Sequence, residues 1–185
     1  MLAILNLFAT IILTITKSKF SQVARRESAF ARAFAKKGQK MRAYPFDEFE
    51  GDVKVLAKRV QAEFVPEVIL AVARGGLTLG HFLAMRLNNR RLFVLNSIHY
   101  DDTQRLDELQ IFNVPDLSEF RKVLIVDDMI DSGETMSAIK SLLQGKFPQC
   151  EFKVATIFYK QNALFKPDFT LKEAKEWIEF FWEKL

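Results

Sequence analysis

The chain has 185 residues, which is long enough for one domain with a sizeable buried core. Apolar residues make up 49% and charged residues 27%, proportions typical of a soluble globular protein. Cys150 is the single cysteine and there are two histidines, which excludes an intramolecular disulfide and a cysteine–histidine metal cluster.

Positive charge is concentrated at the N-terminus. Residues 1–40 contain eight lysines and arginines and one acid, Glu27, for a net charge of +7. Residues 41–185 carry a net charge of −3, so the net +4 of the whole chain does not describe the main domain. The charge therefore gives no support to a nucleic-acid partner.

The first 40 residues differ in character from the rest. Residues 1–15 are almost entirely apolar, but they are fewer than the ~20 that a membrane-spanning helix needs. They lack the basic start and the nearby cleavage site of a secretory signal. We expect an N-terminal extension over 1–40 that is a membrane-surface anchor, a targeting peptide, or sequence upstream of a true start at Met41. One domain over 41–185 follows.

Strands alternate with helices from Met41 onward. Apolar spacing predicts a helix over 46–64, and the aliphatic run 68–72 predicts a buried strand. Arg74, Gly75 and Gly76 then form either a plain turn or an anion-binding loop, because glycines allow close backbone approach and an arginine can bind bidentately. A second helix is predicted over 77–87, ending at Asn88.

Three more strands are predicted, over 91–98, 123–126 and 152–158. The polar stretch 99–120 between the first two is long for a compact domain, which favours a lid. A helix is predicted over 136–143. The pattern indicates an α/β fold with a mostly parallel twisted sheet flanked by helices, plus a small hood or lid.

The C-terminal tail from Pro167 onward permits two interpretations. Trp177, Phe180 and Phe181 have helical spacing, and periodicity favours an amphipathic helix packed on the sheet. The alternative is a strand near Phe169 followed by a loop that presents Trp177 to a flat ligand.

Residues 123–136, VLIVDDMIDSGETM, place two acids at the carboxyl end of a strand and a glycine-containing loop at the start of a helix. Ligands bind at that end of the strands in an open α/β sheet. Backbone N–H groups at a helix start bind phosphate, and the acids suit a sugar or a metal. This stretch predicts a site for a phosphorylated sugar.

The same 14 residues resemble the phosphoribosyl diphosphate (PRPP) binding motif of type I phosphoribosyltransferases at every class position. Three more segments resemble bacterial xanthine-guanine phosphoribosyltransferase: the Arg74-Gly75-Gly76 loop, the strand ending at Lys160, and Trp177-Ile178-Glu179 with Trp182. The stretch 102–105 resembles part of its mobile loop. The resemblance covers about 46–183 and implies a Mg²⁺-dependent enzyme of purine salvage.

The resemblance implies a role for each matching residue. PRPP would be bound by Arg74, Gly75, Gly76, Arg105, Asp127, Asp128, Asp131, Ser132, Gly133, Glu134 and Thr135. Asp128 would also hold Mg²⁺. Asp131 would be the general base near N7 of the purine. Lys160 would bind O6, Trp177 would stack on the ring, and Ile178 would contact it.

Two departures from the family pattern bear on the site. Ser97 and Tyr100 are separated, whereas the family's lid has adjacent Ser and Tyr. Glu134 puts a negative charge in the phosphate loop, which requires its side chain to point outward.

The implied reaction converts xanthine, guanine or hypoxanthine with PRPP to the nucleoside monophosphate and diphosphate, in a cytoplasmic homo-oligomer. Alternatives are a phosphoribosyltransferase for another base and a PRPP-binding regulator without catalysis. Asp131 and the Arg74-Gly75-Gly76 loop favour the enzyme.

Overall fold

The computed structural model describes residues 40–99 and 109–183, and the chain divides into two compact units, Met1–Arg42 and Ala43–Leu185. The account below concerns the second unit. The expectations for the N-terminal extension and for Arg105 in the mobile loop lie outside the described residues. Among the described residues, no helix combines the length and the apolar character needed to cross a bilayer.

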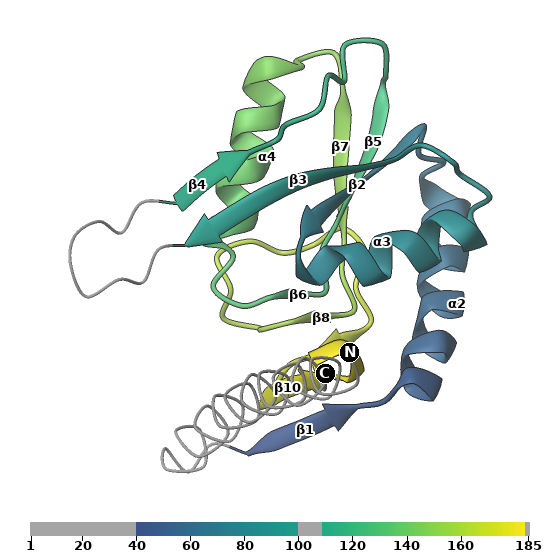
Figure 1. The fold of residues 1–185 in the computed structure, drawn as a ribbon, viewed down its shortest axis with the longest axis vertical. Helices are drawn as coiled ribbons and strands as arrows, with labels where there is room; N and C mark the ends of the chain where they lie inside the picture. Colours follow the sequence, from purple (N-terminus) through teal and green to yellow (C-terminus); the bar gives the residue numbers. More distant parts are fainter. Residues whose placement is uncertain (1–39, 100–108, 184–185) are drawn as a thin grey trace, which may run out of the picture. The chain divides into compact units, whose positions relative to one another are not determined.

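A five-stranded sheet forms the centre of the unit (Figure 1). Its strands lie in the order β4 (Leu109–Phe112), β3 (Leu92–His99), β2 (Val68–Ala73), β5 (Lys122–Val126) and β7 (Glu151–Ala155). β2 pairs in parallel with β3 and β5, β5 pairs in parallel with β7, and β4 runs antiparallel to β3. The predicted mostly parallel sheet is confirmed.

Helices cover both faces of this sheet. Ile69, Leu124 and Val126 pack in one core with α2 (Phe46–Glu63) and α3 (Gly75–Arg86). The alternate strand residues pack in a second core with α4 (Glu134–Lys146): Val68, Leu70, Val72, Val123, Ile125 and Val154. Because successive strand side chains point to opposite faces, a continuous aliphatic run supplies both cores.

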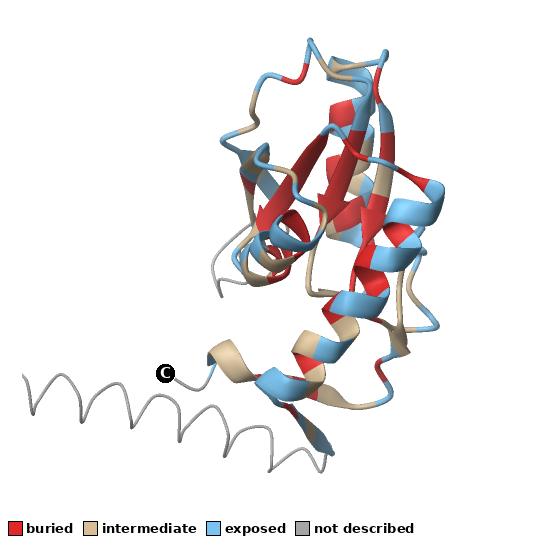
Figure 2. Cartoon of the chain, turned by 90° about the vertical axis from the view of Figure 1, so that its right-hand side faces the viewer, coloured by how far each residue is buried: buried red, intermediate tan, exposed pale blue. Residues whose placement is uncertain are grey.

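The two N-terminal helices follow from local sequence. Along α2, Phe49, Val53, Leu56 and Val60 are buried, and Figure 2 shows a buried and an exposed side to this helix. The predicted helix is confirmed to within one residue. α3, however, begins at Gly75 rather than at the predicted Leu77, so both glycines belong to its first turn.

The predicted strand 152–158 is two strands. β7 ends at Ala155, and β8 (Phe158–Tyr159) belongs to a separate three-stranded sheet with β6 (Met129–Ile130) and β9 (Lys172–Glu173). The break arises because Ile157 and Phe158 donate their N–H groups to the Asp128 carbonyl, 3.2 Å away in each case, instead of continuing the main ladder.

The helix favoured for the C-terminal tail is wrong. After β9 come β10 (Trp177–Phe180), which pairs with β1 (Met41–Tyr44), and a short 3-10 helix, Phe181–Glu183. Ile178 and Phe180 are buried and alternate with partly buried residues, as a strand requires. The strand is favoured because the Phe180 ring packs against Tyr44 and Phe158, at centroid distances of 5.8 and 5.9 Å.

The predicted irregular stretch 99–120 contains a strand within its described part. β4 occupies Leu109–Phe112, with Ile111 opposite Ser97 of β3, and Leu117 is fully buried in the second core. Residues 100–108, which belong to the expected lid, lie outside the described residues.

Two neighbouring leucines of α4 test the second core. Leu143 is fully buried, whereas Leu142 is 36% exposed. We expect Leu143→Ala to lower the free energy of unfolding by about 2–5 kcal/mol, because it leaves a cavity between α4 and the sheet. Leu142→Ala should cost less than about 1 kcal/mol. Urea unfolding monitored by circular dichroism measures both, and equal losses would contradict this packing.

Candidate functional site

A cavity of about 390 Å³ opens at the carboxyl ends of β2 and β5. Seven of the residues predicted from the sequence line it: Arg74, Gly75, Asp127, Asp131, Ser132, Gly133 and Thr135. Ser97 of β3 also lines it, although the sequence indicated this residue only as part of the lid. The loops after two adjacent parallel strands thus meet at one place, as in other open α/β sheets.

The first turn of α3 lies directly against the end of β5. A β-carbon at Gly75 would overlap the Asp128 carboxyl group, and one at Gly76 would overlap the Val126 carbonyl oxygen. Gly75 lines the cavity, whereas Gly76 is buried behind it and directs its N–H toward the Asp127 carboxylate. Glycine is therefore required here for helix–strand contact as well as for approach to a ligand.

Asp127 and Asp128 are held at this junction by the backbone. Asp127 donates its N–H to the Ala155 carbonyl at 3.2 Å, which extends the pairing of β5 with β7. The Asp127 carboxylate accepts the Asp128 N–H at 3.0 Å. The Asp127 carboxylate is thus held where it lines the cavity.

Burial raises the pKa of both carboxyl groups. The pKa of Asp127 lies well above its ordinary range, first because of burial and then because of the neighbouring Asp128 charge. Burial raises the pKa of Asp128 from 3.8 to about 6, against an opposing hydrogen bond from the Met129 N–H. Two adjacent acids that are costly to ionise form a site that favours a cation or a hydroxyl-rich ligand.

Glu183 is a site neighbour that sequence reasoning missed. Its charge contributes to the raised pKa of Asp128, while the pKa of Glu183 is itself raised by burial and lowered by Arg74. Its carboxylate accepts the Phe180 N–H at 3.1 Å. The C-terminal 3-10 helix thus brings a third acid toward the ends of β2 and β5, a placement that no local pattern signals.

The predicted phosphate loop, residues 131–135, lies between the end of β6 and the first turn of α4. Gly133 has φ of +87°, in the left-handed region, and a β-carbon there would overlap Phe165. The Leu164 N–H donates to the Ser132 carbonyl at 2.7 Å, which braces the loop from behind. Glu134 is the first residue of α4 and is exposed, which agrees with the requirement that its side chain point outward.

Asp131 and Lys160 form an ion pair. The pair arises because β6 ends one residue before Asp131 and β8 ends one residue before Lys160, in parallel register with Ile130 opposite Tyr159. The Lys160 N–H donates to the Ile130 carbonyl at 2.9 Å. A second cavity, of about 490 Å³, adjoins this edge and is lined by Lys160, Gln161, Asn162, Glu173, Ala174 and Lys175.

The remaining predicted residues that the structure describes line neither of these two cavities. Trp177 is partly buried at the start of β10, and Ile178 is 2% exposed and packs in the core shared with α2. The Ile178 side chain therefore faces away from solvent, and a contact with a base would involve its backbone. Asp128, Gly76 and Glu134 border the first cavity without lining it.

The donor set fits a hard divalent cation. Residues 40–99 and 109–183 contain no group of three His, Cys, Asp or Glu side chains that could hold a metal without other ligands. Asp127 and Asp128 nevertheless offer carboxylate oxygens, and Mg²⁺ is commonly bound by one or two carboxylates together with substrate phosphates and water. A cation there would also offset the cost of ionising two buried acids.

Comparison with known proteins identifies the class. The family described as "Phosphoribosyl transferase domain" matches residues 46–184, three quarters of the chain, and the chain belongs to this family. A xanthine-guanine phosphoribosyltransferase of Idiomarina loihiensis is 29% identical over 141 residues, covering 75% of this chain and 84% of that protein. A xanthine-guanine phosphoribosyltransferase of Desulfotalea psychrophila is 28% identical, covering 78% of this chain and 89% of that protein.

Solved structures agree with this membership. The Helicobacter pylori xanthine-guanine-hypoxanthine phosphoribosyltransferase superimposes with a TM-score of 0.74 and 39% identity, covering 78% of this chain and 94% of that one. A purine phosphoribosyltransferase of Pyrococcus horikoshii gives a TM-score of 0.69 and 28% identity, covering 78% and 95%. The type I phosphoribosyltransferase fold expected from the sequence is confirmed.

The partly buried acid Asp128 makes folding stability depend on pH. The unfolded chain loses this proton near pH 3.8 and the folded chain near pH 6, so folding stability falls as pH rises through that window. Asp128→Asn removes the penalty. We expect a higher melting temperature than the unaltered protein at pH 7.5 in buffer with a metal chelator, and a difference that shrinks toward pH 5.

Asp116→Asn is the control for that measurement. The pKa of Asp116 is lowered by the Ser118 N–H, so this exposed acid is stabilising when ionised and its loss should give no gain at pH 7.5. A melting temperature of Asp128→Asn at or below that of the unaltered protein at pH 7.5 would contradict the raised pKa of Asp128.

Proposed function

We propose that this protein transfers the 5-phosphoribosyl group of PRPP to a 6-oxopurine base, releasing diphosphate and forming the nucleoside monophosphate. The observation that carries the proposal is that the predicted phosphate loop and the predicted base-binding lysine meet at Asp131. A phosphate loop, residues 131–135, begins at Asp131, and Asp131 is paired with Lys160. The loop suits PRPP, and the lysine suits a purine with an oxygen at C6.

PRPP would lie along the first cavity. The 5′-phosphate fits the start of α4, where backbone N–H groups of the loop and the Thr135 hydroxyl can donate to it. Asp127 and Asp128 would accept hydrogen bonds from the ribose hydroxyls. Arg74 and the Gly75 N–H, at the start of α3, would bind the diphosphate.

We further propose that Asp128 holds Mg²⁺ on the sugar and diphosphate. The ion would supply positive charge that stabilises the departing diphosphate. Arg74 would act on the same developing negative charge, because it lines the cavity at the end of β2. The raised pKa of Asp128 supports this role, since a carboxyl group that is costly to ionise alone gains most from a bound cation.

The base would displace the diphosphate from C1 of the ribose. A bond forms between N9 of the purine and C1, and the bond from C1 to the diphosphate oxygen breaks, with the electron pair leaving on the diphosphate. Asp131 would ease proton loss from the purine near N7. For this, Lys160 must leave Asp131 and donate a hydrogen bond to the O6 oxygen of the base. Adenine has an amino group at C6 instead of an oxygen, so it cannot accept that hydrogen bond.

The named relatives support a purine over another base. Those of Idiomarina loihiensis and Desulfotalea psychrophila are xanthine-guanine enzymes, and that of Helicobacter pylori also includes hypoxanthine in its name. Trp177 would supply the stacking surface. The proposal includes a homo-oligomer in the cytoplasm, as the resemblance implies.

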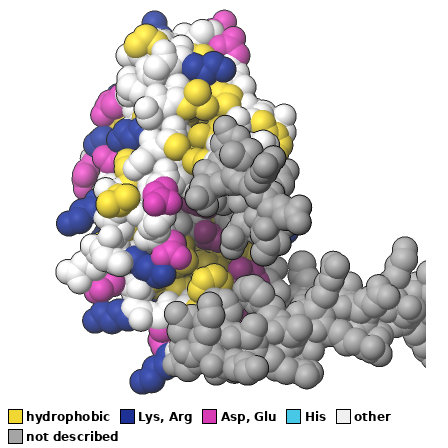
Figure 3. Space-filling model, turned by 90° about the vertical axis from the view of Figure 1, so that its left-hand side faces the viewer, with side chains coloured by type: hydrophobic (Ala, Val, Ile, Leu, Met, Phe, Trp, Pro, Cys, Tyr) yellow, Lys and Arg dark blue, Asp and Glu magenta, His cyan; other side chains and the backbone are white. Residues whose placement is uncertain are grey.

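A regulator that binds nucleic acid is less well supported. Figure 3 shows lysines and arginines mixed with acids across one face of the molecule. A nucleic-acid interface usually gathers basic side chains along one stripe. The net charge of −3 over residues 41–185 agrees with this reading.

The reaction is tested with the purified full chain, Mg²⁺ and PRPP. We expect conversion of xanthine, guanine or hypoxanthine to the monophosphate, and little or no conversion of adenine, because its amino group leaves Lys160 without an acceptor. Competition among the three 6-oxopurines, measured by chromatography of the products, ranks the substrates. Absence of turnover with all three would overturn the proposed activity.

The role of Asp131 is tested separately. Asp131→Asn keeps the shape of the side chain but cannot accept a proton, so we expect kcat to fall by about 10-fold or more. Asp116→Asn, an exposed aspartate that does not line either cavity, is the matched control. An unchanged kcat in Asp131→Asn would remove the general-base assignment.

A further inference from the structure

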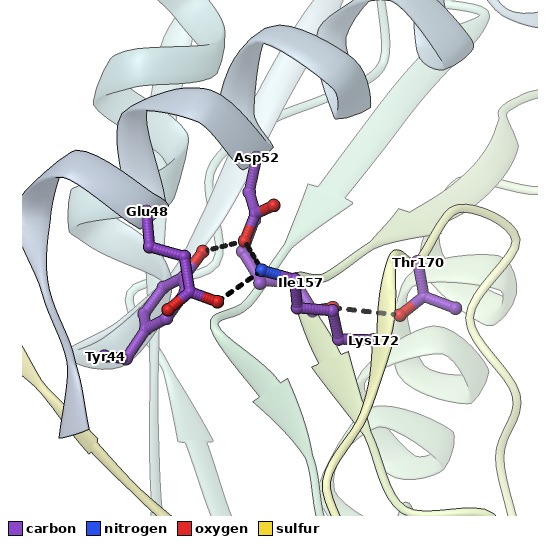
Figure 4. Close-up of polar contacts among 6 residues, drawn as sticks. All are labelled: Tyr44, Glu48, Asp52, Ile157, Thr170 and Lys172. Carbon is purple, nitrogen blue, oxygen red and sulfur yellow. Dashed lines mark hydrogen bonds and ion pairs between the residues drawn. The ribbon is translucent and has the colours of Figure 1, made fainter. Parts of the chain in front are cut away.

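Lys172 of β9 lies between two carboxylates of α2, outside the residues assigned to substrates above (Figure 4). Its ammonium nitrogen is 2.6 Å from Glu48 Oε1 and also pairs with Asp52. Glu48 and Asp52 are four residues apart, so they occupy one face of α2. The three side chains are only 15–29% exposed, so solvent screens this contact less than it does an ion pair on the open surface.

Tyr44 joins the same cluster. Its hydroxyl donates to the Asp52 carboxylate at 2.5 Å, and Figure 4 shows the tyrosine and the lysine converging on Asp52. The fully buried Tyr44 ring packs against Phe158 of β8 and Phe180 of β10, at centroid distances of 4.9 and 5.8 Å. The cluster, Tyr44–Glu48–Asp52–Lys172, therefore contacts both segments that deliver the predicted base-binding residues.

β9 is a short strand at a sheet edge, where the Lys172 N–H donates to the Ile157 carbonyl at 3.0 Å. It has two residues and forms the edge of the β6–β8–β9 sheet. Strands this short are weakly stable without packing against another element. By contrast, α2 is anchored to the main sheet by buried side chains such as Val53, Leu56 and Val60. The ion pairs thus attach a marginal strand to a well-packed helix.

The position of β9 bears directly on Lys160. Lys172 lies opposite Phe158 and Glu173 opposite Tyr159, and the Ala174 N–H donates to the Tyr159 carbonyl at 2.8 Å. Lys160 directly follows the end of β8. The cavity that it lines is also lined by Glu173, Ala174 and Lys175. Trp177 comes two residues after Lys175. A shift of β9 would therefore move one wall of the predicted base site.

We propose that Lys172 is a positioning residue for the purine: by holding β9 on Glu48 and Asp52, it sets the placement of Lys160 and of the segment leading to Trp177. The inference rests on the proposed function. It assigns the cluster no contact with substrate. PRPP would bind at the ends of β2 and β5, which belong to the five-stranded sheet, whereas β9 belongs to the β6–β8–β9 sheet.

Replacement of Lys172 should act locally. The segment before β9 keeps its own links, because Arg59 of α2 donates to the Thr170 carbonyl at 3.1 Å and Thr170 donates to the Ile157 carbonyl at 3.3 Å. Lys172→Met retains much of the side-chain length but leaves two carboxylates facing each other without a cation. The expected result is displacement of β9 from α2 downstream of Thr170.

The test compares Michaelis constants in the full chain. We expect Lys172→Met to raise KM for guanine by about 10-fold and to change KM for PRPP by less than about 2-fold, because small misplacements of binding groups have large effects on the ligand they contact. Lys172→Arg should restore KM for guanine to within about 3-fold, since it keeps the charge. A purely structural role would lower the melting temperature and leave both constants unchanged.

Lys54→Met is the matched control. Lys54 pairs with Glu50 on the same helix at 2.8 Å, but their side chains are 45% and 41% exposed, so the same substitution should leave both constants as they are. An unchanged KM for guanine in Lys172→Met, or equal rises for guanine and PRPP, would overturn the positioning role. If Lys172→Met does not fold, Glu48→Gln replaces it, and no rise in KM for guanine would again overturn the role.

Failure of the proposed function gives a different result. If the unaltered protein turns over no 6-oxopurine, the transfer reaction is wrong, and Lys172 is judged by calorimetric binding of guanosine 5′-monophosphate. Weaker binding by Lys172→Met than by Lys54→Met supports the positioning role. Equal binding by the two variants, or no binding by the unaltered protein, overturns it.

Discussion

The close contact between the first turn of α3 and the end of β5 is the constraint on which the site depends. Gly75 and Gly76 leave room for the Asp128 carboxyl group and the Val126 carbonyl, and no larger residue would. Because the helix is this near, Asp127 and Asp128 are partly buried beside it, and burial raises the pKa values of both. The same approach places Arg74 and the helix N-terminus beside the two acids, where an anionic ligand and a cation can be held together.

The smaller sheet of β6, β8 and β9 positions the residues next to the predicted phosphate loop. β6 and β8 each end one residue before a member of the Asp131–Lys160 pair, and β9 follows alongside them. In the proposed function, the main sheet would serve the phosphorylated sugar and the small sheet would serve the base. The two meet at Asp131, which starts the phosphate loop and faces Lys160. Attachment of β9 to α2 through Lys172 links the small sheet to the well-packed core of the large one.

Prediction from the sequence was most successful where the information is local. The aliphatic strands, the amphipathic helix α2 and the strand–loop–helix over 123–136 follow from periodicity and from short-range turn chemistry. It failed at the tail. Trp177, Phe180 and Phe181 have the spacing of a helix, yet Phe180 lies in a strand because Tyr44 and Phe158, distant in sequence, supply its packing surface. The break between β7 and β8 was likewise missed, since it depends on the Asp128 carbonyl accepting two N–H groups.

The sequence by itself determined the family: four aliphatic residues, two acids and a glycine-containing loop at a helix start match its motif, and these 14 residues predict a site for a phosphorylated sugar. Only the tertiary structure decided how the acids behave, because a pKa depends on burial and on charges such as Glu183, which comes from the far end of the chain. Only the fold could also show that Gly76 serves helix–strand packing and that Lys172 faces Glu48 and Asp52, 124 and 120 residues earlier. Such contacts leave no periodic or local signal, since they form only when separate elements pack.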